Sequence, residues 1–361
     1  MPVIREPEQI ILDLNVRRQP AFRFIDLFAG IGGFRLGMTA NGGECVWTSE
    51  FNKYARQTYE AWFGPENIHG DIMDPSLDLG RDIPDHDVLC GGFPCQPFSL
   101  AGVSKKNSLG RKHGFDDAEK GNLFFRICDI VDAKRPSVLF LENVKNLRSH
   151  DHGRTFSVIL DQLESRNYSV FHEVIDARHW VPQHRERVFI VCFDRDVFGD
   201  QVEFNFPCAP DGPAPTMADV LLPRVDEKYT LSDKLWDYLQ QYAAGHRARG
   251  NGFGFGLVGR KDVSRTLSAR YHKDGSEILV KQRGKNPRRL SHVEARRLMG
   301  YTPEMARIAG HYNDFPIVVS DTQGYRQFGN SVVPQVIAAV GEEIVKTLET
   351  ADRLAPLSKT A

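Results

Sequence analysis

A cysteine between two prolines has the surroundings in this sequence that best suit nucleophilic chemistry. Cys95 stands in the stretch Gly91-Gly92-Phe93-Pro94-Cys95-Gln96-Pro97-Phe98-Ser99, directly after the apolar run 87–90. That run predicts a buried strand that ends at the Gly-Gly pair. Cys95 would then lie on a loop at the carboxyl end of a strand, where open α/β sheets bind ligands. A thiolate there can act as a nucleophile, whereas the alternative is a small buried hydrophobic residue beside a proline turn.

A basic segment follows this stretch. Lys105, Lys106, Arg111 and Lys112 occur among three glycines, and no acid precedes Asp116. We predict a flexible basic loop that can close over a polyanion.

Two acids suggest a cofactor pocket beside a glycine-rich turn. The strand Phe24–Phe28 is followed by the turn Ala29–Gly33, and Glu50 and Asp71 end the next two predicted strands. The dinucleotide fingerprint would require glycine at position 35, where this sequence has Arg35. A nicotinamide dehydrogenase is therefore disfavoured.

A third acid ends an apolar strand. Val138–Leu141 runs into Glu142-Asn143-Val144, and a carboxylate there is costly to bury unless it has a task or a partner. The run Gln183-His184-Arg185-Glu186-Arg187 leads into another apolar strand. Arg185 and Arg187 are candidate site residues, and the alternative is a surface ion-pair cluster with Glu186.

The order of the elements predicts the fold class. Strands and helices alternate over 22–194, which indicates an α/β fold with a doubly wound, mostly parallel sheet. Proline and glycine then increase, so we predict a second, smaller, loop-rich domain over 195–290. Residues 291–361 are expected to return to the first domain through a capped helix (Ser291–Met299), a turn (Gln327–Ser331) and a helix (Pro334–Leu348). Residues 1–21 form an extension with weak patterning.

Charge is distributed unevenly along the chain. The net charge of 361 residues is −1, but the segment Ala243–Leu290 holds twelve Lys or Arg against three Asp or Glu. A solvated face explains a few such charges, whereas an excess of this size in a glycine-rich segment favours phosphate binding.

Composition excludes several other classes of protein. With 41% hydrophobic and 26% charged residues the sequence is typical of a globular protein, and no run approaches the ~18 apolar residues of a membrane span. Residues 1–20 lack the apolar core of a signal peptide. The six cysteines form no C-x-x-C pair, which argues against a disulfide framework or a metal site and predicts a cytoplasmic protein.

The motifs, taken in order, resemble the bacterial DNA (cytosine-5) methyltransferases. They are Asp26–Gly33, Gly92–Ser99, Glu142–Val144, Gln183–Arg187, Arg289–Leu290 with Glu294–Gly300, and Gln327–Pro334. The resemblance implies a methyltransferase fold, the cofactor S-adenosylmethionine, double-stranded DNA as partner and no bound metal. In many relatives a tryptophan follows the acid of the second strand, whereas Phe51 follows Glu50 here.

The resemblance also implies roles for individual residues. The catalytic set is Cys95 as nucleophile, Glu142 at the base nitrogen N3, Arg187 at the base oxygen, and Arg185 at the nearby backbone or base. The cofactor-binding set is Phe28, Gly30, Gly32, Glu50, Phe51, Asp71, Asn330 and Ser331. The DNA-binding set is Gln96, Ser99, Lys105, Lys106, Arg265, Thr266, Arg270 and Lys273. Asn143 would position the catalytic loop.

The target is expected to be a short CC...GG site. The segment Thr266–Leu279 resembles the Dcm-type methylases of CC(A/T)GG and related sites. A tRNA cytosine-5 methyltransferase of the same lineage is the alternative within this chemistry, and a catalytically silent DNA-binding regulator is the alternative outside it. An amino-methylase would need a D/N-P-P-Y/F loop, which the sequence lacks. We expect a monomer whose functional partner is a cognate restriction endonuclease.

Overall fold

A sheet of seven strands organises the part of the chain that positions the site. The computed structural model describes residues 20–66, 68–94, 123–252, 254–311 and 315–354, and the sheet order in this part is β3-β2-β1-β4-β5-β7-β6. The strands are β1 (Phe22–Leu27), β2 (Gly43–Ser49), β3 (Ile68–His69), β4 (Val88–Gly92), β5 (Val138–Val144), β6 (Tyr168–Asp176) and β7 (Glu186–Asp194). Only β7 runs antiparallel to its neighbours in this sheet. The predicted doubly wound, mostly parallel sheet is therefore confirmed.

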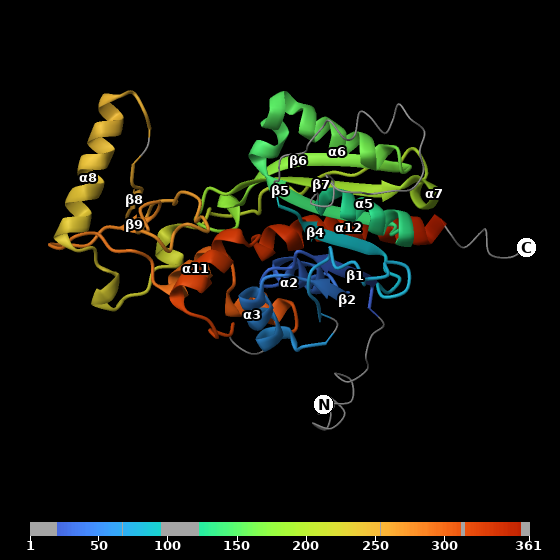
Figure 1. Cartoon of the computed structure of the whole chain (residues 1–361), viewed down its shortest axis with the longest axis horizontal. Coiled ribbons are helices and arrows are strands. Elements are labelled where there is room, and N and C mark those ends of the chain that lie inside the picture. Colours follow the sequence, from blue (N-terminus) through green and yellow to red (C-terminus); the bar gives the residue numbers. More distant parts are fainter. Residues whose placement is uncertain (1–19, 67, 95–122, 253, 312–314, 355–361) are drawn as a thin grey trace, which may run out of the picture.

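Helices cover both faces of the sheet (Figure 1). The helices up to β7 are α2 (Gly33–Ala40), α3 (Lys53–Phe63), α5 (Leu123–Lys134) and α6 (Arg154–Glu164), with the short 3-10 helices η1 (Lys145–Gly153) and η2 (Ala177–His179). Phe24 and Phe140 pack in a core with α2, whereas Ile25 and Leu139 pack in a second core with α5 and α6. Because both faces of the central strands are buried, their sequences read as continuous apolar runs.

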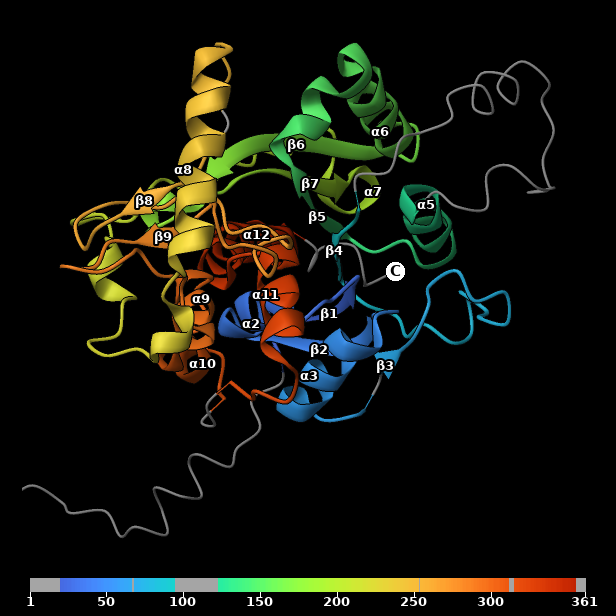
Figure 2. The same cartoon turned by 60° about the vertical axis from the view of Figure 1, so that its left-hand side comes forward.

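Residues 195–290 contain few regular elements. They hold α7 (Arg195–Phe198), η3 (Met217–Asp219), η4 (Glu227–Tyr229), α8 (Asp233–Ala248), β8 (Leu257–Val258) and β9 (Leu279–Val280). Helix α8, which the sequence analysis did not predict, buries only Leu239 and stands at the end of the molecule away from the sheet (Figures 1 and 2). Tyr271 contacts Tyr325 and belongs to the core that also contains α2. The proposed domain limits remain a prediction.

The C-terminal segment returns to the sheet. It contains α9 (His292–Leu298), α10 (Pro303–Ile308), α11 (Asp321–Asn330) and α12 (Pro334–Leu354). The predicted capped helix is confirmed, because Ser291 and Glu294 form a reciprocal capping box on α9. Helix α12 packs on α2, where a Cβ at Gly37 would lie 2.6 Å from Ile337.

One local prediction was wrong. Residues 327–330 form the last turn of α11 and not an irregular turn. Ser320 caps this helix, and Tyr325 and Phe328, three positions apart, are both buried. Packing therefore overrides the low helix propensity of Gly329. Among the described residues, none of the helices is both long enough and apolar enough to cross a membrane.

Candidate active site

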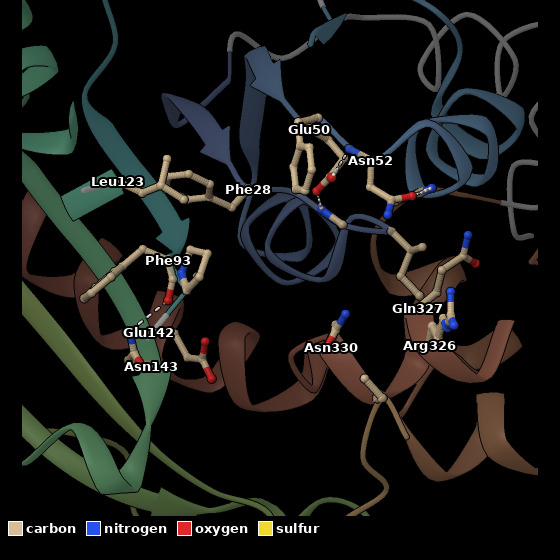
Figure 3. Close-up of a pocket in the computed structure, with 18 of the residues that line it drawn as sticks. Phe28, Glu50, Asn52, Phe93, Leu123, Glu142, Asn143, Arg326, Gln327 and Asn330 are labelled. Carbon is tan, nitrogen blue, oxygen red and sulfur yellow. Dashed lines mark hydrogen bonds between the residues drawn. The ribbon is translucent and has the colours of Figure 1, made fainter. Parts of the chain in front are cut away.

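A cavity of about 950 Å³ lies where the central strands end (Figure 3). Its lining comes from the ends of β1, β2, β4 and β5, from α11, and from residues 266–269 of the loop-rich region. Nine predicted site residues line it: Phe28, Gly30, Glu50, Phe51, Asp71, Glu142, Arg187, Thr266 and Asn330.

In the turn between β1 and α2, every second residue from Phe28 to Gly32 has a left-handed backbone conformation. Phe28, Gly30 and Gly32 have φ of 56°, 57° and 83°. The backbone N–H of Gly30 thereby donates to Glu50 at 2.8 Å. Gly32, which belongs to the predicted cofactor-binding set, does not line the cavity. A Cβ on Gly32 would come within 2.3 Å of the Phe63 ring, so glycine is required there for packing against α3 as well as for its positive φ.

Glu50 holds two segments of the cavity wall. Its buried carboxylate accepts the N–H of Gly30 at 2.8 Å and the N–H of Asn52 at 2.7 Å. Burial raises the pKa of Glu50, and the two N–H donors oppose that rise. Asn52 in turn caps α3 with its side chain. Each carboxylate oxygen keeps a lone pair for a further donor, which suits ribose hydroxyl groups.

The other cofactor candidates differ in their exposure. The Phe51 side chain is 70% exposed at the cavity, and Asp71 is exposed and accepts the N–H of Met73 at 2.9 Å. Asn330 projects into the cavity from the end of α11 (Figure 3). Ser331 is buried and bonds Tyr301 and the Val332 carbonyl, so it does not line the cavity.

Glu142 and Arg187 form a largely buried ion pair. The Arg187 Nε lies 2.9 Å from Glu142 Oε1, and the pair bridges the adjacent strands β5 and β7. Burial raises the pKa of the Glu142 carboxyl, and the charges of Arg187 and then Arg185 oppose it. Glu186 pairs with Lys145 instead. The alternative of a surface cluster around Glu186 is therefore wrong.

Asn143 fastens the chain that leads toward the predicted nucleophile. Its Nδ2 donates to the Phe93 carbonyl at 2.8 Å, and its Oδ1 accepts the N–H of Val144. Phe93 and Pro94 line the cavity. Asn143 therefore holds the chain at Phe93, and its positioning of the loop that carries Cys95, which lies outside the described residues, stays a prediction.

Arg185 lies away from the cavity. Its guanidinium is buried and donates to the carbonyls of Leu267 at 3.0 Å, Gly329 at 2.9 Å and Ser331 at 2.5 Å. Burial and the neighbouring Arg187 lower the pKa of Arg185 to about 9. The sequence analysis expected Arg185 at the nearby backbone or base, and all three of these hydrogen bonds go to carbonyls of the protein backbone.

The DNA-binding candidates fall into two groups. Cys95, Gln96, Ser99, Lys105 and Lys106 lie outside the described residues. Arg265, Arg270 and Lys273 are exposed, and Arg265 donates to the Gly254 carbonyl at 3.1 Å. Thr266 donates to the His184 carbonyl at 2.5 Å.

The sequence analysis missed several residues of the wall. They are Asn52, Ile72, Met73, Leu123, Ala269, Gln323, Arg326 and Gln327. Most stand within a few positions of a motif, so sequence proximity was the available signal. No group of three His, Cys, Asp or Glu side chains suited to a metal ion occurs in the described part of the chain.

The fold defines the class of protein, because the seven-stranded, mostly parallel sheet has the arrangement of the S-adenosylmethionine-dependent methyltransferase fold. Solved structures share this fold: Dnmt2 of S. pombe has a TM-score of 0.64 at 16% identity, covering 91% of this chain and 98% of that one. Spodoptera frugiperda DNMT2 has a TM-score of 0.65 at 20% identity, covering 91% and 99%.

Sequence comparison identifies the family. The model of the C-5 cytosine-specific DNA methylases matches residues 22–346. The DNA-cytosine methyltransferase of Escherichia coli K12 is 47% identical, over 89% of this chain and 77% of that protein. The type II methyltransferase M.NlaX of Neisseria lactamica is 48% identical, over 91% and 97%. The chain belongs to this family: it is a DNA (cytosine-5) methyltransferase that uses S-adenosylmethionine.

Proposed function

We propose that the enzyme methylates a cytosine flipped out of a short duplex site, through a transient covalent bond to Cys95. The observation that supports this most is the buried pair of Glu142 and Arg187 at 2.9 Å, on the wall of the cavity that Glu50 also lines. Glu142, the proposed contact of the cytosine base, and Glu50, the proposed contact of the cofactor, thus line the same cavity. The chain continues from Pro94, on the same wall, into Cys95.

The chemistry requires a nucleophile because carbon 5 of cytosine is itself unreactive. The Cys95 thiolate adds to carbon 6, and the electron pair of the 5,6 double bond makes carbon 5 an enamine carbon. When bound, S-adenosylmethionine would supply the electrophilic methyl group for carbon 5 and leave as S-adenosylhomocysteine. A base then removes the proton from carbon 5, the double bond re-forms, and the carbon–sulfur bond breaks to return the thiolate.

Glu142 and Arg187 suit the stabilisation of this addition. Negative charge develops toward N3 of the ring, and burial of the Glu142 carboxyl raises its pKa, which favours holding a proton for N3. Arg187 uses Nε for Glu142 and one terminal nitrogen for the Glu186 carbonyl, so further N–H groups remain for the base oxygen.

The residues at the other end of the cavity fit the cofactor. Glu50 retains acceptor capacity for ribose hydroxyls, and Phe51 offers an exposed aromatic face for the adenine. Asn330 presents an amide from α11, and Phe28, Gly30 and Asp71 line the same cavity. We infer that Gly32 and Ser331 support this pocket indirectly.

Access to the ring requires that the base leave the duplex, at a cost of a few kcal/mol in stacking and pairing. We propose that Gln96 and Ser99 stabilise the opened site and that Lys105 and Lys106 contact phosphates, as expected for cations beside a polyanion. Residues 195–290 would form the target-recognition domain.

The target is proposed to be of CC...GG type, such as CC(A/T)GG. The resemblance of Thr266–Leu279 to methylases of such sites carries this assignment, and exposed Arg265, Arg270 and Lys273 supply side chains that read guanine edges. Several relatives are named type II methyltransferases, which supports a cognate endonuclease as functional partner. The enzyme itself is proposed to be a monomer.

A trapping experiment tests the mechanism. Duplex DNA with 5-fluorocytosine in the target should form a stable covalent complex with the wild-type enzyme and S-adenosylmethionine, because fluorine cannot leave as the proton does. Cys95→Ser should form no complex and transfer no methyl group, while still binding S-adenosylhomocysteine. Turnover by Cys95→Ser, or a wild-type enzyme that is not trapped, would overturn the proposal. Bisulfite sequencing of host DNA reports the target, and methylation outside a CC...GG pattern would refute that part.

A further inference from the structure

We propose that Gln183 and Arg185 are positioning residues that fix the recognition segment, defined as Ser264–Ala269, against the catalytic domain. The inference rests on the proposed role of this segment in DNA binding. It further assigns to Arg185 a second task, which is to hold the end of α11 beside the cofactor.

Two stretches of backbone run side by side at this junction. The Ser264 N–H donates to the Pro182 carbonyl, and the His184 N–H donates to the Ser264 carbonyl, both at 2.9 Å. Gln183 and Ser264 thereby form a parallel bridge. The Thr266 hydroxyl extends the contact with its bond to the His184 carbonyl at 2.5 Å. The start of the recognition segment is thus aligned on residues 182–184.

The Gln183 side chain forms hydrogen bonds with the next part of the recognition segment and with the end of α9. Its side chain is 0% exposed, its Oε1 accepts the Leu267 N–H at 2.7 Å, and its Nε2 donates to the Leu298 carbonyl at 3.1 Å. An amide provides both the acceptor and the donor that these two backbone groups need. Neither hydrogen bond goes to the ends of β1 and β2 or to α11, where the predicted cofactor-binding residues lie.

Arg185 joins the same segment to a different element. Its three acceptors are the carbonyls of Leu267, Gly329 and Ser331, and the last two flank Asn330. The recognition segment crosses directly over α11 here, since a Cβ at Gly329 would lie 2.2 Å from the Ala269 nitrogen. Loss of the Arg185 hydrogen bonds would therefore release both the recognition segment and the end of α11.

The spacing of the motif connects this junction to the chemistry. Gln183 and Arg185 bind the recognition segment, and Arg187, two positions further, pairs with Glu142 at 2.9 Å. Residues two apart lie on one side of an extended chain. A shift of the segment would displace its cavity-lining residues relative to Glu142, and misplacement of about 1 Å costs up to ~10²-fold in rate.

The test compares two substitutions that separate the two tasks. Gln183→Met should raise the KM for cognate DNA about tenfold and leave the Kd for S-adenosylhomocysteine, measured by equilibrium binding, within about twofold. Arg185→Lys should raise both the KM for cognate DNA and the Kd for S-adenosylhomocysteine, because one ammonium group cannot reach all three carbonyls. Tyr271→Phe is the matched control: it loses buried hydrogen bonds to Ile278 and Leu290 in the same region but touches neither junction contact.

Three results would overturn the proposal. They are a wild-type KM for DNA in Gln183→Met, a Kd for S-adenosylhomocysteine unchanged in Arg185→Lys, and a Tyr271→Phe variant with the same changes as Gln183→Met. If Gln183→Met does not fold, Thr266→Ala replaces it. That variant should raise the KM for DNA by a smaller factor, with Thr266→Ser restoring the wild-type value because it keeps the hydroxyl donor.

The junction and the recognition role can fail separately. If Arg265→Ala and Arg270→Ala leave the methylated consensus unchanged while Gln183→Met still raises the KM for DNA, base reading by Arg265 and Arg270 is refuted and the positioning role stands. If the two arginine variants alter the consensus while Gln183→Met behaves as wild type, the recognition role stands and the positioning role is refuted.

Discussion

The buried carboxyl of Asp26 should make this enzyme less stable as the pH rises. Asp26 lies in the middle of the sheet, between Thr48 of β2 and Cys90 of β4, and is fully buried. Burial raises its pKa from 3.8 to about 8, against the smaller opposing effects of the Arg35 charge and the Arg35 backbone N–H. Unfolding returns the carboxyl to water, where its pKa is near 3.8.

The sign and the size follow from proton linkage. Between about pH 4 and pH 8 the folded state holds a proton that the unfolded state has lost, so the free energy of unfolding falls as the pH rises. At 1.36 kcal/mol per pH unit, a rise from 3.8 to about 8 corresponds to at most ~6 kcal/mol. Asp26→Asn keeps the shape of the protonated group and removes the titration.

Urea unfolding of both proteins from about pH 5 to pH 9 measures this effect. We expect Asp26→Asn to gain stability over wild type steadily from about pH 5 to about pH 8, by a total of several kcal/mol, and the difference to level off above about pH 8. The difference between the two proteins isolates Asp26 from Glu50 and Glu142, whose pKa values burial also raises. A difference that is constant with pH, or that favours wild type at pH 9, would refute the reasoning.

Three further predictions concern catalysis and recognition. Glu142→Gln should slow methyl transfer by ~10² to 10⁴ and abolish the decline in wild-type activity above the raised pKa of Glu142; near wild-type rates across pH would make Glu142 structural only. Arg270→Ala should weaken discrimination at one guanine by ~1 to 3 kcal/mol in a randomised-site methylation library, whereas an equal loss on all sequences would indicate a phosphate contact. Arg126→Met removes the 2.9 Å bond to the Ile72 carbonyl on the cofactor wall, so the KM for S-adenosylmethionine should rise several-fold at unchanged KM for DNA, with Asp129→Asn as the control that keeps this bond.

Features that depend on neighbouring residues in the sequence were predictable. The apolar runs of β1, β4 and β5 indicated buried parallel strands, and Ser291 with Glu294 indicated a capped helix start. The twenty-residue spacing of Gly30 and Glu50 placed an acid beside the Gly-rich turn, where the bond of 2.8 Å is found. These features follow from the two-residue period of strands, from the hydrogen bonds that cap a helix, and from the fact that the carboxyl ends of parallel strands meet at one edge of the sheet.

Other features depended on contacts between distant segments. Residues 327–330 continue a helix because Phe328 is buried in a core shared with α9 and α12, and α8 keeps almost no buried face from which its position could be inferred.

The sequence by itself determined the fold class, the strand-end acids and the motif that carries Glu142, because each is encoded locally. Only the tertiary structure decided that Arg187 reaches the cavity while Arg185 does not. Leu267 is 82 positions from Arg185 and Gly329 is 144 positions away, yet their carbonyls surround its guanidinium. A buried cation goes where acceptors replace its water, and no local pattern specifies acceptors that distant parts of the chain supply.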